Sequence, residues 1–92
     1  MNTEERESLR DAVLDVLNAY PTIPRTQSGI ARETRKCVGF PAANEEVEAA
    51  LTLLLGLGLV QYQTKDTGAI RWWSITSAGM LRCERGGFAG KS

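Results

Sequence analysis

Apolar residues recur at helical spacing between residues 44 and 57, the most strongly patterned stretch of the chain. They are Val47, Ala50, Leu51, Leu54 and Leu57. Residues three and four apart lie on one side of a helix, so this stripe is expected to face a core. Gly58 is expected to end the helix, because glycine tolerates the left-handed conformation of a helix stop. Leu59 and Val60 then open an extended run.

The N-terminal segment predicts a first helix. Thr3 is expected to cap it and Pro21 to end it. One face carries Leu9, Ala12, Val13, Val16 and Tyr20. Leu14 lies roughly 140° around the helix from Leu9, outside this stripe. Residues 22–24 leave room for an edge strand at most.

A second helix is predicted to start near Thr26 or Ser28 and to run to about Val38. Its thin apolar stripe consists of Ile30, Ala31, Thr34 and Val38. Residues 39–41, Gly-Phe-Pro, break this helix, and Phe40 is expected to fill the core between the second and third helices. A longer turn then leads to Asn44, where the third helix begins.

The chain after Gly58 predicts a β-hairpin. Residues 60–64 alternate between apolar and polar side chains, as a half-buried strand does. Residues 65–68 contain turn formers, and residues 69–76 are rich in aromatic and β-branched side chains. Residues 77–85 can form a short last helix. The sequence therefore predicts one α+β domain over residues 1–86, with three helices, a two-stranded hairpin and a short C-terminal helix, followed by a flexible tail at 87–92.

Several apolar residues fall outside the predicted core stripes. Leu14, Leu53 and Leu55 lie off their helices' stripes, and Trp72 must point away from Trp73 across the strand. Leu14, Leu53 and Trp72 are thus candidates for a partner interface, most simply that of a homodimer. The alternative is that the leucines are single exposed residues and that Trp72 folds onto a neighbouring helix.

Composition narrows the possible functions. The chain has 92 residues, with 11 basic and 11 acidic side chains, two cysteines and no histidine. Cys37 and Cys83 do not have metal-ligand spacing, and no nucleophile–base pair is recognisable, so we expect no metal, no cofactor and no catalysis. No apolar run approaches the roughly 20 residues that span a bilayer. The polar N-terminus is unlike a signal peptide, so a cytoplasmic location without membrane contact is expected.

The charges are segregated along the chain. Residues 1–20 and 44–60 each sum to −3, whereas residues 21–43 and 61–92 each sum to +3. The cations of the second segment are Arg25, Arg32, Arg35 and Lys36, and those near the predicted hairpin turn are Lys65 and Arg71. Either set can be an ordinary solvated surface, or can bind a polyanion.

The pattern resembles the winged-helix superfamily that includes the MarR-like and ArsR-like bacterial regulators. The residues that carry this resemblance are Val47, Leu51, Leu54, Gly58, Leu59 and Val60, followed by the run Trp73-Ser74-Ile75-Thr76-Ser77-Ala78-Gly79. In length and in the long turn before the third helix, the chain is also similar to small winged-helix proteins of Mu-like phages and prophages. The resemblance implies a winged helix-turn-helix fold and a role in DNA binding and transcription regulation, in a protein of bacterial or phage origin.

The resemblance also implies which residues would contact double-stranded DNA. The cations at 25, 32, 35 and 36 would lie along the phosphate backbone, and Lys65 and Arg71 on the wing would do the same. Asn44 and Thr52 would reach base edges from the third helix. Glu45, Glu46 and Glu48 oppose this, because carboxylates near phosphates cost Coulomb energy. The alternative hypothesis is therefore a winged-helix protein-interaction module that does not bind DNA.

Overall fold

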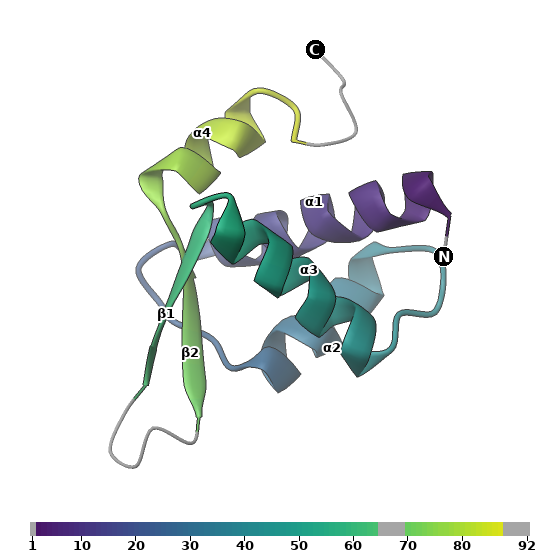
Figure 1. Ribbon diagram of the computed structural model, residues 1–92, viewed down its shortest axis with the longest axis horizontal. Helices are drawn as coiled ribbons and strands as arrows, with labels where there is room; N and C mark the ends of the chain where they lie inside the picture. Colours follow the sequence, from purple (N-terminus) through teal and green to yellow (C-terminus); the bar gives the residue numbers. More distant parts are fainter. Residues whose placement is uncertain (1, 65–69, 88–92) are drawn as a thin grey trace.

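The computed structural model describes residues 2–64 and 70–87. The elements follow one another in the predicted order (Figure 1). They are α1 (Thr3–Ala19), α2 (Gln27–Cys37), α3 (Asn44–Gly56), β1 (Val60–Thr64), β2 (Arg71–Ile75) and α4 (Ser77–Glu84). This is an α+β arrangement, as predicted from the sequence. The predicted turn at residues 65–68 and the tail at 88–92 lie outside the described residues, whereas Gly87 lies within them.

Helix α1 begins with a cap that differs from the predicted one. The Asn2 side chain accepts a hydrogen bond from the Glu5 backbone N–H at 2.8 Å, and the Glu5 carboxylate accepts one from the Asn2 N–H at 3.1 Å. Thr3 is therefore the first helical residue and not the cap. The reason is that the capping box pairs a cap residue with a glutamate three positions later, and Asn2 has Glu5 at that distance.

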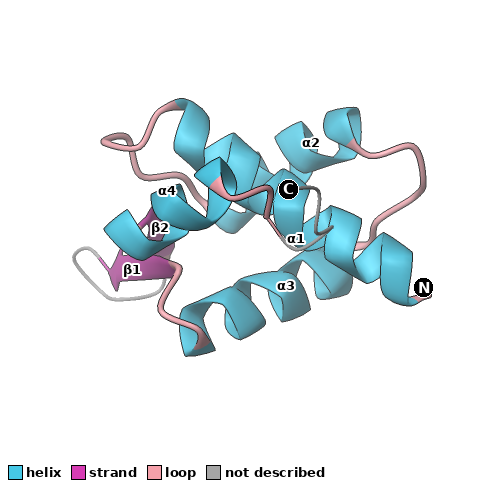
Figure 2. Cartoon of the chain, turned by 90° about the horizontal axis from the view of Figure 1, so that it is seen from above, coloured by secondary structure: helices cyan, strands magenta, loops and turns pink. Residues whose placement is uncertain are grey.

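The buried side of α1 is wider than one stripe. Leu14 and Leu17 are each 1% exposed, so the prediction that Leu14 belongs to a partner interface is wrong. Helix α1 contacts α2, α3, α4 and β2, and Figure 2 shows it surrounded by the other helices. A helix with neighbours on several sides buries residues well beyond a single-sided stripe. Tyr20, expected in the core, is 56% exposed because the helix ends at Ala19 and the backbone turns away.

Helix α2 follows the prediction closely. The Thr26 hydroxyl accepts a hydrogen bond from the Gly29 N–H, and Ile30, Ala31 and Thr34 are buried. Phe40, in the segment after α2, is half-buried and packs against the core, as predicted.

Helix α3 places its predicted stripe in the core, with one exception. Val47, Ala50, Leu51 and Leu54 are all 5% exposed or less. Leu57 is 53% exposed and so is not a core residue. The helix ends at Gly56, and Gly58 has a φ of +75°, so the chain turns into β1 before another helical turn could bring position 57 against the core. Gly58 adopts the left-handed conformation that was predicted for it.

The hairpin is antiparallel and closes one side of the helices. Val60 pairs with Ile75 and Tyr62 with Trp73, and the Tyr62 and Trp73 rings lie 5.0 Å apart. Trp73 is 2% exposed, as expected of a core residue. Arg25 forms a bridge on the other edge of β2, because its backbone N–H and carbonyl both bond to Trp73, at 2.8 and 2.7 Å. The edge contact anticipated at residues 22–24 is thus made one residue later.

Helix α4 packs across α1 and the end of the hairpin (Figure 1). The Thr76 hydroxyl caps α4 by accepting from the Gly79 N–H. Gly79 lies against the Leu59 carbonyl, where a side chain has no room. On the α1 side, the Cys83 thiol is hydrogen-bonded to Asp15. These contacts hold the C-terminal helix away from the side of the molecule where α2, α3 and β2 meet.

Candidate functional site

A cleft of about 520 Å³ separates β2 from the N-terminus of α2 and the outer side of α3. It is lined by Thr26, Gln27, Ser28, Glu48, Ile70, Arg71 and Trp73. Figure 1 shows where the three elements that line it, β2, α2 and α3, lie in the fold. The first backbone N–H groups of a helix have few internal partners and attract anions. The cleft therefore combines a partial positive charge from α2 with the side chain of Arg71.

Arg71 is a predicted DNA-contact residue that lines this cleft. Its guanidinium lies 4.8 Å from the centre of the Tyr62 ring, and that ring in turn packs against Trp73. Cation–π stacking fixes the guanidinium plane and leaves its N–H edges available for acceptors. Lys65, the other cation predicted on the hairpin, lies outside the described residues.

Arg35 and Asn44 meet at the turn between α2 and α3. Arg35 donates from Nε to the Ala42 carbonyl at 2.8 Å and from Nη2 to the Asn44 Oδ1 at 2.6 Å. Glu46 also accepts from the Ala43 N–H at 2.9 Å, which caps the start of α3. Both predicted contact residues are exposed, but these bonds occupy them in fixing the beginning of α3. Their first role is therefore structural.

The other cations of residues 21–43 differ from one another in their contacts and exposure. Lys36 forms an ion pair with Glu33 at 3.1 Å, which balances its charge on the surface of α2. Arg32 is exposed. Arg25 places its guanidinium 5.5 Å from the centre of the Tyr20 ring, and its Nε is buried without a hydrogen-bond partner among the described residues. These three cations therefore have different surroundings, as does Arg35.

The outer face of α3 is acidic and apolar. Glu45, Glu48, Ala49, Thr52 and Leu53 line a shallow hollow of about 470 Å³. The Thr52 hydroxyl donates to the Glu48 carbonyl at 2.9 Å, so it is used within the helix. Residues 44–56 contain no lysine or arginine. This face offers a polyanion little attraction of its own.

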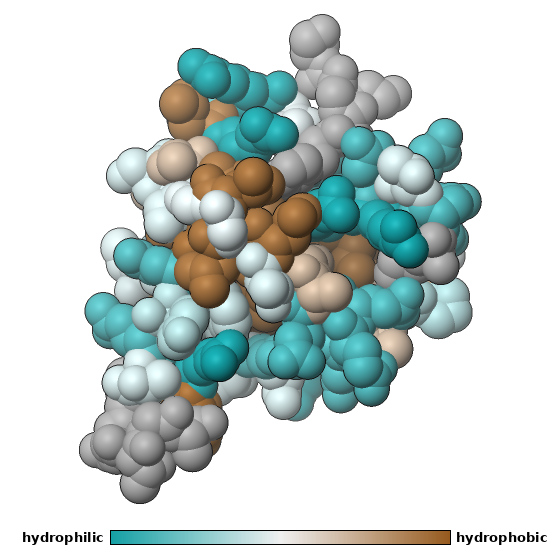
Figure 3. Space-filling view, viewed as in Figure 1, coloured by the Kyte–Doolittle hydropathy of each residue, from teal (hydrophilic) through white to brown (hydrophobic). Residues whose placement is uncertain are grey.

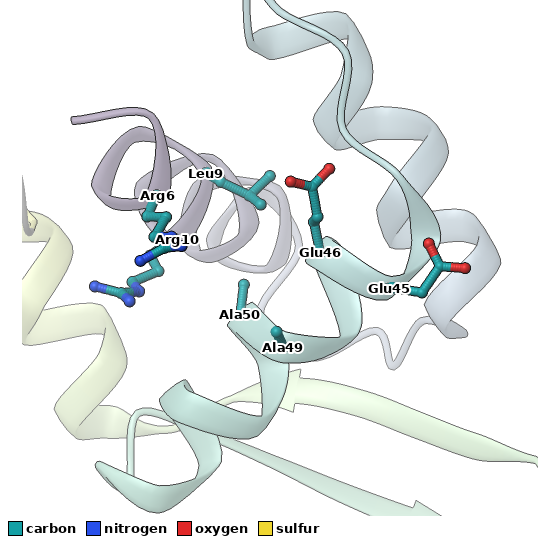
Figure 4. Close-up of a pocket in the computed structure, with 7 residues that line it drawn as sticks. All are labelled: Arg6, Leu9, Arg10, Glu45, Glu46, Ala49 and Ala50. Atoms are coloured by element: carbon teal, nitrogen blue, oxygen red, sulfur yellow. The ribbon is translucent and has the colours of Figure 1, made fainter. Parts of the chain in front are cut away.

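A second groove lies between α1 and α3 (Figure 4). Its volume is about 370 Å³, and it is lined by Arg6, Leu9, Arg10, Glu45, Glu46, Ala49 and Ala50. Sequence reasoning missed this groove, because nothing in the helical pattern shows which polar residues of two different helices adjoin. It also missed Thr26, Gln27 and Ser28, although the cap at Thr26 marks the beginning of α2 and could have suggested them.

The residues predicted for a partner interface differ in their exposure. Leu14 is buried, as described above, while Leu53 is 38% and Leu55 37% exposed. Trp72 is half-buried, on the hairpin face opposite Trp73. Of the three residues predicted for a partner interface, Leu53 is therefore exposed on α3, Trp72 is half-buried and Leu14 is buried.

The two cysteines are free thiols. Burial, Asp15 and Asp11 raise the pKa of Cys83 to about 11, and burial raises the pKa of Asp15 above its ordinary value. Over residues 2–64 and 70–87, no group of three histidine, cysteine, aspartate or glutamate side chains is placed to hold a metal ion. The thiol–carboxyl contact therefore belongs to the packing of α4 on α1.

No protein-family model matches the chain, and no curated protein is significantly similar to it. Within the described part of the chain, none of the helices has the length and apolar character needed to cross a membrane.

Proposed function

We propose that the protein is a winged-helix protein that binds double-stranded DNA, chiefly through the phosphate backbone, and regulates transcription. Three helices followed by a hairpin, with Arg25 paired to the outer edge of β2, support the winged-helix assignment. The observation that carries the proposal is the cleft that gathers the N-terminus of α2, the outer face of α3 and Arg71 on one side of the molecule.

A phosphate in this cleft would find several donors. The backbone N–H groups at the start of α2 favour an anion, and the side chains of Thr26, Gln27 and Ser28 line the same space. Arg71 would approach the phosphate from β2 with an orientation set by Tyr62. Backbone contacts of this kind position a duplex without reading its sequence.

The carboxylates of α3 limit the strength of such binding. Glu48 lines the phosphate cleft, and Glu45 lies on the same outer face. Each would repel a nearby phosphate and offset part of the counterion-release gain. We therefore expect modest, strongly salt-dependent affinity for duplexes of any sequence.

Fluorescence anisotropy with a random duplex at several salt concentrations tests the proposal. Arg71→Ala should weaken binding and reduce the slope of log K against log salt by about 0.9. Glu48→Gln should tighten binding, because it removes a charge from the cleft. Arg85→Ala, at the exposed residue that follows α4, is the matched control and should change neither quantity. Absence of binding at low salt would overturn the proposal.

The acidic and apolar outer face of α3 favours a second candidate function, the protein-interaction module without DNA binding. An interface core typically combines exposed apolar side chains with few cations, as Ala49 and Leu53 do here. The same experiment separates the two functions. No binding to random duplexes and promoter fragments would favour the protein module, whereas binding unaffected by Arg71→Ala would show that the duplex binds outside this cleft.

A further inference from the structure

Glu48 is a residue of the cleft beside β2 that opposes the binding of duplex DNA. Its carboxylate lines the same space as Arg71. Among residues 2–64 and 70–87 this carboxylate forms neither a hydrogen bond nor an ion pair, and Arg71 lies over the Tyr62 ring without pairing with Glu48. The cleft therefore offers a ligand an anion and a cation that do not neutralise each other.

Part of the cleft wall is apolar. Ile70, which is 55% exposed, and Trp73, which is 2% exposed, both line it. The indole N–H of Trp73 is buried and has no hydrogen-bond partner among the described residues. A buried donor without a partner marks a place where a water molecule, an ion or a ligand belongs. This wall can cover the face of a flat ring, and its unpaired donor is a separate indication that something binds here.

The size and surroundings of the cleft favour a small polar ligand. Its volume of about 520 Å³ falls within the roughly 300–1,000 Å³ of small-molecule sites. Figure 3 shows mostly polar side chains over α2 and the hairpin on this side of the molecule, whereas apolar side chains gather over α3. An apolar segment of another protein would find little to cover in this polar region.

We propose that the cleft binds a free guanine nucleotide. Its phosphate lies at the N-terminus of α2 and Arg71, and its base lies against Ile70 with Glu48 at its Watson–Crick edge. A carboxylate only accepts hydrogen bonds, and guanine has two adjacent donors, N1–H and the N2 amino group, on this edge. Adenine and cytosine each have a ring-nitrogen acceptor beside their amino group, so Glu48 would repel part of that edge. The charge that opposes DNA thus selects guanine.

The nucleotide would also regulate DNA binding, and this part of the inference rests on the proposed function. The phosphate of either ligand needs the same N–H groups of α2 and the same Arg71 side chain. Glu48 has opposite effects on the two ligands, because it repels a duplex and holds a guanine base. A guanine nucleotide would therefore displace duplex DNA at a concentration at which an adenine nucleotide does not.

Isothermal titration calorimetry of the full chain at low salt, with GMP, AMP and inorganic phosphate as ligands, tests the inference without DNA. GMP should bind about tenfold or more tightly than AMP, because AMP leaves the carboxylate facing an acceptor. Glu48→Gln should remove most of this preference, since glutamine offers a single acceptor oxygen. Arg71→Ala should weaken the binding of GMP and AMP by similar factors. Glu84→Gln, at an exposed glutamate of α4, is the matched control and should leave the preference unchanged.

Equal affinities for GMP and AMP would overturn the proposal, as would a preference that survives Glu48→Gln or inorganic phosphate bound as tightly as GMP. Glu48 is exposed, so its variant should fold, and circular dichroism melts check this. GMP binding by a protein with no affinity for duplexes would leave this inference standing and remove the proposed function. Duplex binding without a preference for GMP would remove this inference alone.

Discussion

The two faces of α3 differ sharply. The inner face presents Val47, Leu51 and Leu54, each no more than 1% exposed and packed among α1, α2 and the hairpin. The outer face presents Glu45, Thr52 and Leu53, which are exposed and line a shallow hollow. One helix thus has an inner face whose side chains are held by packing and an outer face whose side chains are mostly exposed.

This difference shows that burial can be inferred from the spacing of apolar residues, whereas function cannot. On the inner face, apolar spacing and burial coincide, because removing this stripe from water favours the folded state. On the outer face, function depends on which other elements adjoin it. The cleft lined by Arg71 also needs β2 and α2, and the charged groove needs α1.

The largest expected effect compares neighbouring leucines on the two faces. Leu54→Ala should lower the free energy of unfolding by about 2–5 kcal/mol, because it opens a cavity in a fully buried site. Leu53→Ala, one residue earlier, should cost less than about 1 kcal/mol at a concentration where the protein is monomeric. Urea denaturation of both variants measures the difference. Equal losses would mean that α3 does not separate a core from a surface.

The next prediction compares two glycines near the same helix. Gly79, in α4, lies against the carbonyl of Leu59, which follows α3 in the chain. A Cβ at position 79 would come within 2.6 Å of Ile75 Cγ1. Gly79→Ala should therefore lower the free energy of unfolding by about 1–3 kcal/mol. Gly56→Ala is the control, since a Cβ there meets nothing within 4 Å and alanine favours the helix. A tolerated Gly79→Ala would show that α4 can move away from the hairpin at little cost.

Much of the fold could be predicted from local chemistry. The start of α2 near Thr26 or Ser28 and the stop at Gly58 were recognisable because each depends on one residue type and a few neighbours. Leu14 was misassigned because its burial depends on α4, which packs against α1 from the far end of the chain. Leu57 was misassigned because helical periodicity does not show where the last turn loses its neighbours.

The candidate site was less predictable for the same physical reason. Arg71 was identified from its charge on the hairpin, but the cleft it lines also needs residues 26–28 from a different element. Arg35 and Asn44 were assigned to DNA contact, and a sequence does not reveal that they bond to each other. Long-range proximity between polar side chains has no periodic signal along a chain, so charged residues alone did not locate the site.

A smaller effect is expected at the one polar side chain on the buried side of α2. Thr34 is fully buried, and its hydroxyl has no hydrogen-bond partner among the described residues. Thr34→Val replaces this hydroxyl by a methyl group of similar shape, and should leave stability unchanged or raise it by about 1 kcal/mol. Thr34→Ser keeps the hydroxyl and removes the methyl, so it should destabilise. A marked loss in Thr34→Val would mean that the hydroxyl is bonded after all, for example by an internal water molecule.

The smallest effect concerns the α1–α4 contact, far from both faces of α3. The pKa of Cys83 is raised from 9.0 to about 11 by burial and by Asp15 and Asp11. Below pH 9 the thiol is protonated in the folded and unfolded states alike. Above pH 9 the unfolded chain loses this proton first, so the folded state should lose stability as the pH rises towards 11. Solvent screening at this partly buried group keeps the loss below about 1 kcal/mol, or a few degrees in Tm.

Thermal melts of wild type and Cys83→Ser across this pH range isolate the thiol. Serine retains a hydroxyl that can bond to Asp15 but does not ionise here, so its Tm should fall less steeply with pH than that of wild type. The titration of all other groups is common to both proteins and cancels in the difference between the two curves. Parallel curves would show that folding does not raise the pKa of this thiol.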